Sequence, residues 1–419
     1  MKSRLTLLFA AGLLLAGTAG AADWPQWRGP NRNAISQETG LLKQWPADGP
    51  RLLWQINTLG NGFSTPSIVG DRIYLQSNRG LQNELLHALN AADGSLAWET
   101  RLGAVGNPNQ MPNYPGARST PTVDGDVIYA LGSDGDLVCV NRANGEERWR
   151  KSLRNDFGGA PGRWAYAESP LVDGDAVIVT PGGTQASLLK LNKRTGAEIW
   201  RCVVPGGEEA AYASVIVAEL GGVRQYVQML ARGVVGVDAA TGRFLWRDDR
   251  AVGRSQANIP TPVAHDNAVY AATGQGGGAL VKLTAAGGAV TAAPGYADRG
   301  LPNGIGGFVR LGDLLYGTAG PAMTCVEFAT GQVRWSERGI GAAAVCYADG
   351  LFFLHGEDTG LVALVEATPE AYREKGRFSP PNLPDRPQGA KAWAHPVVAN
   401  GRLYLRDINM LWCYDVQAP

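Results

Sequence analysis

The chain alternates hydrophobic and polar residues in short runs, and each run is interrupted by a Gly-Asp, Asp-Gly or Thr-Gly pair or a close variant of one. One form of the recurring unit begins at residues 64, 119, 168 and 260, where it reads STPSIVGDRIYL, STPTVDGDVIYA, ESPLVDGDAVIV and PTPVAHDNAVYA. Alternation on both sides of a two-residue turn is typical of a β-hairpin. Each run therefore predicts two antiparallel strands.

A second hairpin unit follows the first in each repeat and ends in tryptophan. It reads HALNAADGSLAW, LVCVNRANGEERW, LLKLNKRTGAEIW, VVGVDAATGRFLW and MTCVEFATGQVRW, starting at residues 87, 137, 188, 234 and 323. Two hairpins make four strands, which is the content of one β-propeller blade. The pattern therefore predicts an all-β fold built from four-stranded antiparallel blades.

The spacing of the repeats predicts the number of blades. The first four tryptophans of these units are 51, 51 and 46 residues apart, and the gap of 89 to the next fits two repeats, one of which has lost its tryptophan at residues 280–294. First strands near residues 64, 119, 168, 213, 260, 305, 343 and 394 give eight blades, with seven as the alternative.

The two ends of the repeat region complement each other. The last repeat stops after LWCYDV at residues 411–416 and lacks a fourth strand, whereas residues 50–60, PRLLWQINTLG, carry Trp54 without three strands ahead of them. Pairing these two segments closes the ring and leaves no open edge. We therefore expect one propeller over residues 50–417, preceded by an extended segment at residues 22–49.

The repeated tryptophans have a structural explanation. A blade is a small twisted sheet that cannot bury both faces alone, so a large flat residue on its outer strand packs against the turn of the neighbouring blade. We assign this structural role to Trp54, Trp98, Trp149, Trp200, Trp246 and Trp335.

The first residues predict export. Lys2 and Arg4 precede an apolar run at residues 5–15 and the small residues AGA at 19–21, the pattern of a secretory signal peptide cleaved near Ala21. Cleavage there leaves Ala22 first rather than a lipid-carrying cysteine, and the apolar run is too short to span a bilayer. We expect a periplasmic or secreted protein, a monomer without a membrane span or lipid anchor.

Charge and composition exclude several classes of function. With 38 basic and 38 acidic residues the chain is neutral, which argues against a nucleic-acid partner. The four histidines are scattered and no metal-binding spacing occurs, so we predict no metal site. No G-x-S-x-G or phosphate-binding motif occurs, and we predict no catalytic residue. Cys139, Cys325 and Cys413 occupy equivalent places in their repeats, which favours small apolar fillers over a disulfide.

A candidate ligand site lies where loops lead into the innermost strands, because such loops converge on the axis of a propeller. The residues at these places are Phe63, Arg118, Tyr166, Glu168, Tyr212, Asn258, Asn303, Trp393 and His395. They line either a wet channel or a specific site. The loop at residues 103–118 is the longest of these connections, which is typical of binding loops, and Arg118 at its end either pairs with Glu168 or holds an anionic ligand.

The pattern of Asp or Asn, three residues, Gly, three residues and Trp resembles the repeat of the pyrroloquinoline quinone (PQQ) quinoprotein-like propellers, over residues 23–417. Two branches share this repeat: the PQQ-dependent dehydrogenases, and the non-catalytic B lipoprotein of the outer-membrane β-barrel assembly machinery. Residues 23–36, DWPQWRGPNRNAIS, also resemble the start of uncharacterised exported proteins with this repeat. The resemblance is specific for fold and less so for function.

The dehydrogenase branch implies PQQ beside two adjacent cysteines, with calcium held by Glu, Asn and Asp. No two cysteines are adjacent here, and the lipoprotein branch fits better in length. We therefore expect an exported binding or scaffold propeller for a protein, peptide or small ligand at the axial funnel, without a cofactor. The alternative is a PQQ- and calcium-dependent dehydrogenase that oxidises an alcohol or sugar.

Overall fold

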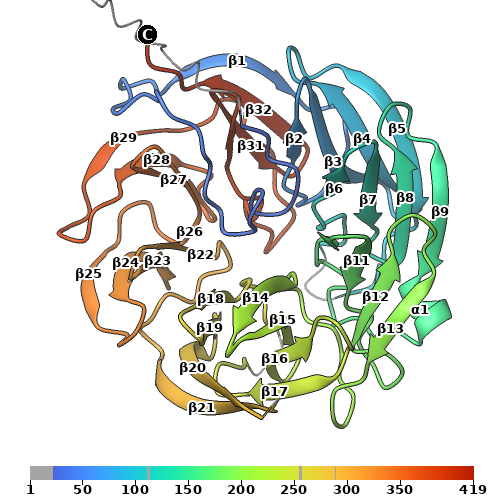
Figure 1. Ribbon diagram of the computed structural model, residues 1–419. Helices are drawn as coiled ribbons and strands as arrows, with labels where there is room; N and C mark the ends of the chain where they lie inside the picture. The colour runs from blue at the N-terminus through green and yellow to red at the C-terminus, as the bar shows by residue number, and fades with distance from the viewer. Residues whose placement is uncertain (1–21, 111–113, 254–256, 288) are drawn as a thin grey trace, which may run out of the picture.

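Eight four-stranded antiparallel sheets surround a central axis in the computed structural model of the protein (Figure 1). The structure describes residues 22–110, 114–253, 257–287 and 289–419. The predicted signal peptide at residues 1–21 and Met111 of the predicted binding loop lie outside these ranges. The prediction of an eight-bladed propeller is confirmed.

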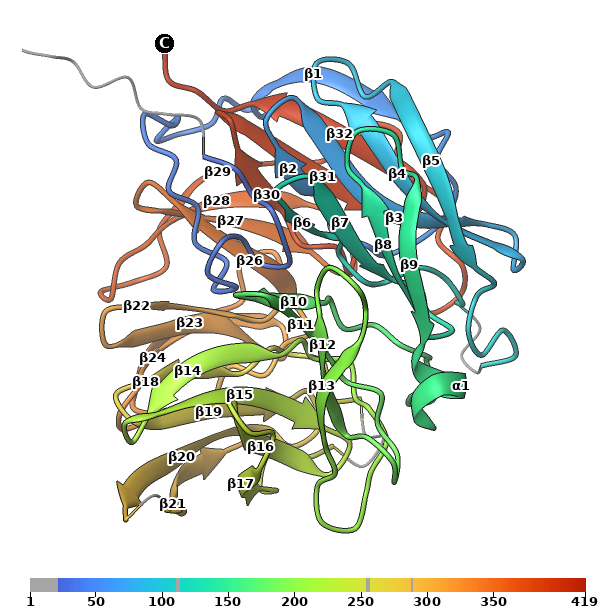
Figure 2. The same cartoon turned by 45° about the vertical axis from the view of Figure 1, so that its right-hand side comes forward.

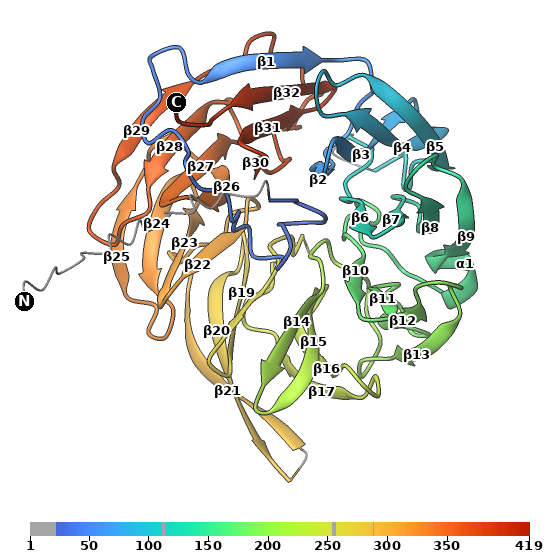
Figure 3. The ribbon, with the colours of Figure 1, turned by 45° about the horizontal axis from the view of Figure 1, so that its top comes forward.

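The blades follow one another along the chain, and their first strands lie nearest the axis (Figures 1 and 3). Blades one to four consist of β2 (Ser67–Val69), β3 (Arg72–Arg79), β4 (Asn83–Asn90) and β5 (Leu96–Gly103); β6 (Thr122–Asp124), β7 (Val127–Leu131), β8 (Asp136–Asn141) and β9 (Glu147–Ser152); β10 (Leu171–Asp173), β11 (Ala176–Val179), β12 (Leu188–Asn192) and β13 (Glu198–Cys202); and β14 (Ile216–Leu220), β15 (Val223–Leu230), β16 (Gly233–Asp238) and β17 (Phe244–Asp248).

The second half of the ring repeats this order. Blades five to eight consist of β18 (Val263–His265), β19 (Ala268–Thr273), β20 (Gly277–Ala286) and β21 (Ala289–Asp298); β22 (Phe308–Leu311), β23 (Leu314–Ala319), β24 (Ala322–Glu327) and β25 (Val333–Glu337); β26 (Ala343–Ala348), β27 (Leu351–Gly356), β28 (Val362–Glu366) and β29 (Glu374–Phe378); and β30 (Val397–Ala399), β31 (Arg402–Asp407), β32 (Met410–Asp415) and β1 (Arg51–Ile56). One short helix, α1 (Leu153–Phe157), follows blade two at the end of β9 (Figure 2). No helix in the described part of the chain is long and apolar enough to cross a membrane.

Two-residue turns set the register of the first hairpin in several blades. Gly70 and Asp71 alone separate β2 from β3, and Gly70 has φ 59°. In blade five, Asp266 and Asn267 take the same place with φ 46° and 56°. Turns with positive φ match the right-handed twist of the paired strands. The Gly-Asp pairs in the sequence therefore mark true hairpin turns.

The ring closes between the two ends of the repeat region. Strand β1 pairs antiparallel with β32, so that Arg51 lies opposite Asp415 and Ile56 opposite Leu411. Figure 3 shows β1 lying along the outer edge of the blade formed by β30, β31 and β32. The predicted closure by an N-terminal strand is confirmed, and blade eight is complete.

Most of the repeated tryptophans bridge neighbouring blades. Trp98 on β5 donates its indole N–H to the carbonyl oxygen of Arg142 at 3.1 Å. Its ring packs so closely on Gly145 that a Cβ atom at this position would clash with it. Gly145 has φ 73°, so the turn needs glycine both for its conformation and for the close approach of the ring. The same contact recurs at the turns that receive Trp54, Trp149 and Trp200.

Three of the five cysteines stand directly opposite a repeated tryptophan in the sheet. Cys139 is the cross-strand partner of Trp149, Cys325 of Trp335 and Cys413 of Trp54. All five cysteines of the protein are buried and free. The cysteines therefore fill the space beside an indole ring.

Blades four and five depart from the predicted packing. Trp246 is 4% exposed and turns into its own blade, where its indole N–H donates to Gln225 at 2.6 Å across Gly236. In the next blade the long strands β20 and β21 are joined directly as a hairpin. The described residues of this blade therefore offer the Trp246 indole no glycine turn of the kind that Trp98 covers. Tyr296 on β21 replaces the lost tryptophan: it donates to the carbonyl oxygen of Phe328 at 2.7 Å. Trp246 therefore does not cover a neighbouring turn as predicted, although it packs in one hydrophobic cluster with residues of blades four and five, such as Val227 and Val281.

The N-terminal segment crosses the middle of the ring (Figure 3). Residues 24–36 hydrogen-bond to the first strands, or to residues beside them, of widely separated blades; these partners are Ile68, Val123, Pro170, Thr261, Phe308, Tyr347 and Val398. Arg28, Arg32 and Ala34 have left-handed φ values of 60°, 54° and 60°. Such conformations persist only where surrounding contacts fix them. The segment is therefore an integral plug of the axial channel.

Candidate functional site

A pocket of about 210 Å³ opens where the loops enter the first strands, above the plug. We call it the axial pocket. Its walls consist mainly of aromatic and aliphatic side chains, contributed by Trp27, Phe63, Tyr114, Arg118, Trp164, Ala167, Tyr212, Ser214, Ala257, Ile259, Ile305, Trp393 and His395. Apolar surface gathered in one concave place is typical of a binding site rather than of ordinary protein surface.

Three aromatic rings from different blades form one wall. The ring centroids of Phe63 and Trp393 are 5.1 Å apart, those of Tyr114 and Trp393 are 5.0 Å apart, and those of Phe63 and Tyr114 are 6.4 Å apart. These separations and tilted angles are favourable for aromatic pairs. Because each ring comes from a different loop, the cluster fixes the loops of blades one, two and eight to one another.

A second pair of aromatic residues forms another wall of the pocket, and Trp27 of the plug forms its floor. Trp164 and Tyr212, from the loops into blades three and four, form an edge-on pair with centroids 5.9 Å apart. The Tyr212 hydroxyl accepts a hydrogen bond from the Trp164 backbone N–H at 3.1 Å. Trp27 of the plug lies 4.5 Å from the His395 ring, and its indole N–H donates to Thr261 at 2.9 Å. The floor of the pocket is thereby held by the N-terminal segment.

Arg118 is the cation of the axial pocket. Its guanidinium donates to the carbonyl oxygens of Gly116 at 2.7 Å and Tyr114 at 2.9 Å, and it lies 5.3 Å from the Phe63 ring centroid. Within the described chain it forms no ion pair, and the predicted pairing with Glu168 is wrong. A guanidinium carries five N–H donors, so two bonds leave three for a ligand.

The electrostatics of the pocket favour negative charge. Burial lowers the pKa of Arg118 to about 10, which still leaves the side chain charged at neutral pH. Burial, aided by the nearby Arg28 guanidinium, holds the pKa of His395 well below its usual range, so this ring is neutral. No carboxylate lines the pocket among the described residues. Arg118 is therefore the charged side chain among the described residues that line the pocket, and the carboxyl group of Glu84, buried behind the lining, interacts with it.

Three more arginines lie buried close to the axis. Arg28, Arg32 and Arg406 are 3%, 5% and 1% exposed, and none forms an ion pair with any described residue. They donate instead to backbone carbonyls: Arg32 to Ser169 at 2.7 Å, and Arg406 to Gln76 at 2.5 Å. Burial lowers the pKa of each of the three below its usual value. The buried carboxyl groups of Glu168 and Glu84 partly offset this positive charge, since Glu168 interacts with Arg32 and Glu84 with Arg118.

The structure brings five of the nine predicted site residues together and directs two others into the blades. Phe63, Arg118, Tyr212, Trp393 and His395 line the axial pocket. Tyr166 instead donates its hydroxyl to the carbonyl oxygen of Pro181 at 2.8 Å, within the core of blades two and three. Glu168 is 2% exposed and accepts from the Thr180 hydroxyl at 2.7 Å.

The two predicted asparagines also form hydrogen bonds with backbone carbonyl groups. Asn258 is fully buried and donates to the carbonyl oxygens of Leu230 and Ala231 at 2.8 and 3.1 Å. Asn303 donates to the carbonyl oxygen of Arg299 at 3.2 Å. These residues hold the incoming loops in place and do not line the pocket.

Sequence reasoning missed several pocket residues, among them Trp27, Trp164 and Ile305. Trp27 belongs to a segment without any strand pattern, and its contact with Thr261 spans 234 positions of sequence. Trp164 stands further before its strand than the predicted residues do. One signal was present: Trp164 and Tyr114 are aromatic residues in long incoming loops, where large apolar side chains are more typical of binding than of linkage.

The residues do not fit the PQQ and calcium of the dehydrogenases. The five cysteines lie apart on different strands, and no group of three His, Cys, Asp or Glu side chains in the described ranges is placed to hold a metal ion. A volume of about 210 Å³ is also below the 300–1,000 Å³ that is usual for cofactor and drug-sized ligands. The pocket suits a smaller group, of the size of one side chain.

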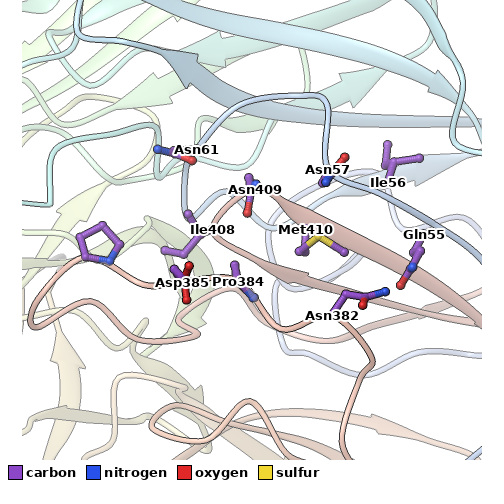
Figure 4. Close-up of a pocket in the computed structure, with 11 residues that line it drawn as sticks. Gln55, Ile56, Asn57, Asn61, Asn382, Pro384, Asp385, Ile408, Asn409 and Met410 are labelled. Carbon is purple, nitrogen blue, oxygen red and sulfur yellow. The ribbon is translucent and has the colours of Figure 1, made fainter.

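A second pocket lies beside blade eight and has different chemistry. It measures about 450 Å³ and is lined by Gln55, Ile56, Asn57, Asn61, Asn382, Pro384, Asp385, Pro387, Ile408, Asn409 and Met410 (Figure 4). Amide groups predominate, and neither an aromatic nor a basic side chain lines it among the described residues. The axial pocket is therefore the better candidate for a specific site.

Comparison with known proteins identifies the family. The family model for the outer membrane protein assembly factor BamB, PQQ_2, matches residues 29–110 and 82–337, and the chain belongs to this family. The BamB of Shewanella oneidensis is 25% identical over 233 residues, which cover 54% of this chain and 52% of that protein. The BamB of Alkalilimnicola ehrlichii is 28% identical over 141 residues, covering 33% of this chain and 32% of that protein. The matched region thus spans about half the length of these relatives or less.

Solved structures share the fold. The crystal structure of BamB from Moraxella catarrhalis aligns with a TM-score of 0.59 at 16% identity, covering 88% of this chain and 98% of that one. A quinohemoprotein alcohol dehydrogenase from Pseudomonas putida HK5 aligns equally well, with a TM-score of 0.59 at 14% identity, covering 95% and 81%. Both branches of the predicted resemblance are therefore structural neighbours, and the fold alone does not separate them.

Proposed function

We propose that this protein is an exported, non-catalytic scaffold that assists the assembly of outer-membrane proteins by binding a protein partner at the axial pocket. Membership of the BamB family supports the role in assembly. The observation that carries the proposal is the pocket itself: half-exposed aromatic side chains from separate blades converge beside one unpaired arginine. Aromatic residues and arginine are the groups that contribute most to protein–protein binding.

The dehydrogenase alternative receives less support. Its cofactor needs carboxylate ligands for calcium, and the walls of the axial pocket supply none among the described residues. A scaffold needs only a rigid surface, which the eight closed blades provide.

Deletion of the gene in its host tests the proposed function. We expect less folded β-barrel protein in the outer membrane, measured by the heat-modifiable migration of these proteins on gels, and recovery when the wild-type chain is restored. Unchanged barrel folding in the deletion strain would contradict the role in assembly. PQQ- and calcium-dependent dye reduction by the purified protein would favour the dehydrogenase instead.

A further inference from the structure

The axial pocket combines features that define the chemistry of its occupant. On the basis of the proposed function, we propose that the pocket takes one aromatic side chain of a partner protein, together with the carboxylate of an Asp or Glu next to it in the partner's sequence. Arg118 would bind the carboxylate, and the rings of Phe63, Tyr114 and Trp393 would contact the aromatic group.

The size and depth of the pocket support a single side chain. Its volume of about 210 Å³ lies below the range for whole cofactors. The plug bonds to the first strands themselves, at Ile68, Val123 and Phe308, and these lie further along the axis than the incoming loops. The channel is therefore closed beneath Trp27, so a partner chain cannot thread through the ring. The partner chain instead inserts one side chain into the axial pocket from its open end, while the partner's backbone stays outside the pocket.

The walls select an aromatic group. Phe63, Tyr114 and Trp393 pack at centroid distances of 5.0–6.4 Å, and an added ring continues this cluster. Aromatic pairs in such arrangements contribute beyond the apolar area they bury. The rings are held from loops of different blades, so little side-chain freedom is lost on binding, which favours affinity.

The charges select an anion beside that ring. Arg118 lies 5.3 Å from the Phe63 centroid, so a carboxylate that reaches the guanidinium stands next to a ring packed on Phe63. Three N–H groups of Arg118 remain for it, and charge-assisted hydrogen bonds of this kind are among the strongest in proteins. Among the described residues no carboxylate lines the pocket, so a Lys or Arg next to the partner's aromatic residue would meet the charge of Arg118 without an acidic partner of its own and would be repelled.

Short capped peptides test this proposal with the full mature chain. Isothermal titration calorimetry would compare acetyl-Gly-Ser-Trp-Asp-Ser-Gly-amide with versions that carry Lys for Asp or Ala for Trp. A fourth peptide ends in Trp with a free carboxylate, and indole-3-acetate represents a small aromatic acid. We expect the Trp-Asp peptide to bind and the Lys and Ala versions to bind at least ten-fold more weakly.

Variants of the protein link that binding to the pocket. Arg118→Gln is expected to weaken the Trp-Asp peptide on the order of ten-fold and to abolish its preference over the Trp-Lys peptide. Arg201→Gln removes a charge from the outer strand of blade three, where Arg201 pairs with Glu198 at 2.8 Å, and should leave binding unchanged. Trp393→Ala should abolish binding, with circular dichroism confirming that the variant is folded.

Several results would overturn the proposal. These are no binding of the Trp-Asp peptide at 1 mM, equal binding of the Asp and Lys versions, or an Arg118→Gln variant that binds like Arg201→Gln. Tighter binding of the free-carboxylate peptide would assign the anion to a chain terminus, and binding of indole-3-acetate alone would assign the pocket to a small molecule. In the deletion strain, full complementation by Arg118→Gln would refute this inference while leaving the proposed function intact.

Discussion

Trp54 is the residue that tests ring closure most sharply. It lies on the N-terminal strand β1, donates its indole N–H to the carbonyl oxygen of Ala91 at 3.1 Å and packs over Gly94 of blade one. The Trp54→Ala substitution removes both contacts. It also weakens the packing of β1 on the rest of blade eight, because Trp54 lies opposite Cys413 of β32 and its ring centroid is 6.3 Å from that of Tyr404 on β31. The pairing of β1 with β32 is the place where the ring closes between two ends of the chain.

The structure sets the size of the expected effect. Replacing a fully buried tryptophan by alanine costs about 3–5 kcal/mol, and half of that applies to a half-buried ring. The lost hydrogen bond adds about 1 kcal/mol, giving roughly 3 kcal/mol in all. With an unfolding entropy of about 2.1 cal/mol/K per residue, the melting temperature of a cooperative unit of residues 50–417 falls by about 4 °C.

Differential scanning calorimetry at a fixed scan rate measures this effect against two controls. Trp149→Ala breaks an equivalent contact, over Gly196 and with an indole N–H bond to the carbonyl oxygen of Lys193 at 3.0 Å, within a continuous part of the ring, and should lower the melting temperature by a similar amount. Leu96→Ala changes a side chain that is 47% exposed and should have little effect. If Trp54→Ala melts like Leu96→Ala, the ring closure contributes little stability and the reasoning is refuted.

Further predictions concern single residues. Gly145→Ala should lower the urea midpoint more than Gly174→Ala, because both have positive φ but only the former collides with a tryptophan ring; equal midpoints would contradict this. Burial raises the pKa of Glu168 from 4.5 to about 7, so the folded state holds a proton more tightly and stability falls as pH rises from 4.5 to 7. Because burial also raises the pKa of Glu84 to about 7, Glu168→Gln should reduce the fall of the melting temperature across that window without removing it, and an unchanged slope would refute the assignment. Arg118→Gln should melt within about 2 °C of the parent, since it breaks no ion pair, whereas loss of the partly buried Trp393 ring in Trp393→Ala should lower the melting temperature by about 3 °C on the same arithmetic as for Trp54.

The parts of the fold that depend on neighbouring residues could be predicted from the sequence. Alternation and two-residue turns fix the hairpins within about a dozen residues, as Gly70 and Asp71 do between β2 and β3. The closure could also be predicted, because the last repeat, ending at residue 416, lacks a fourth strand and residues 50–60 form an extra one. The necessary information lies in short patterns, one for each hairpin and one at each end of the repeat region for the closure.

The orientation of individual side chains could not be predicted in this way. Tyr166 and Trp393 both stand just before a first strand, yet one bonds to Pro181 inside the blade and the other faces the pocket. Trp246 has the same sequence pattern as the other repeated tryptophans, but its indole N–H bonds to Gln225 of its own blade instead of to a turn of the next one. Trp27 reaches the pocket through contacts more than two hundred positions away. Such outcomes depend on packing between blades.

Photo-cross-linking in living cells tests the central claim, that the axial pocket binds a protein partner. A photoreactive benzoylphenylalanine would replace Phe63 in the pocket or, as a control, Leu96 on the outer face of blade one. We predict an adduct at position 63 whose partner segment, mapped by mass spectrometry, contains an aromatic residue beside Asp or Glu, and which is lost with Arg118→Gln. No adduct at position 63, or the same adducts from both positions, would contradict the claim.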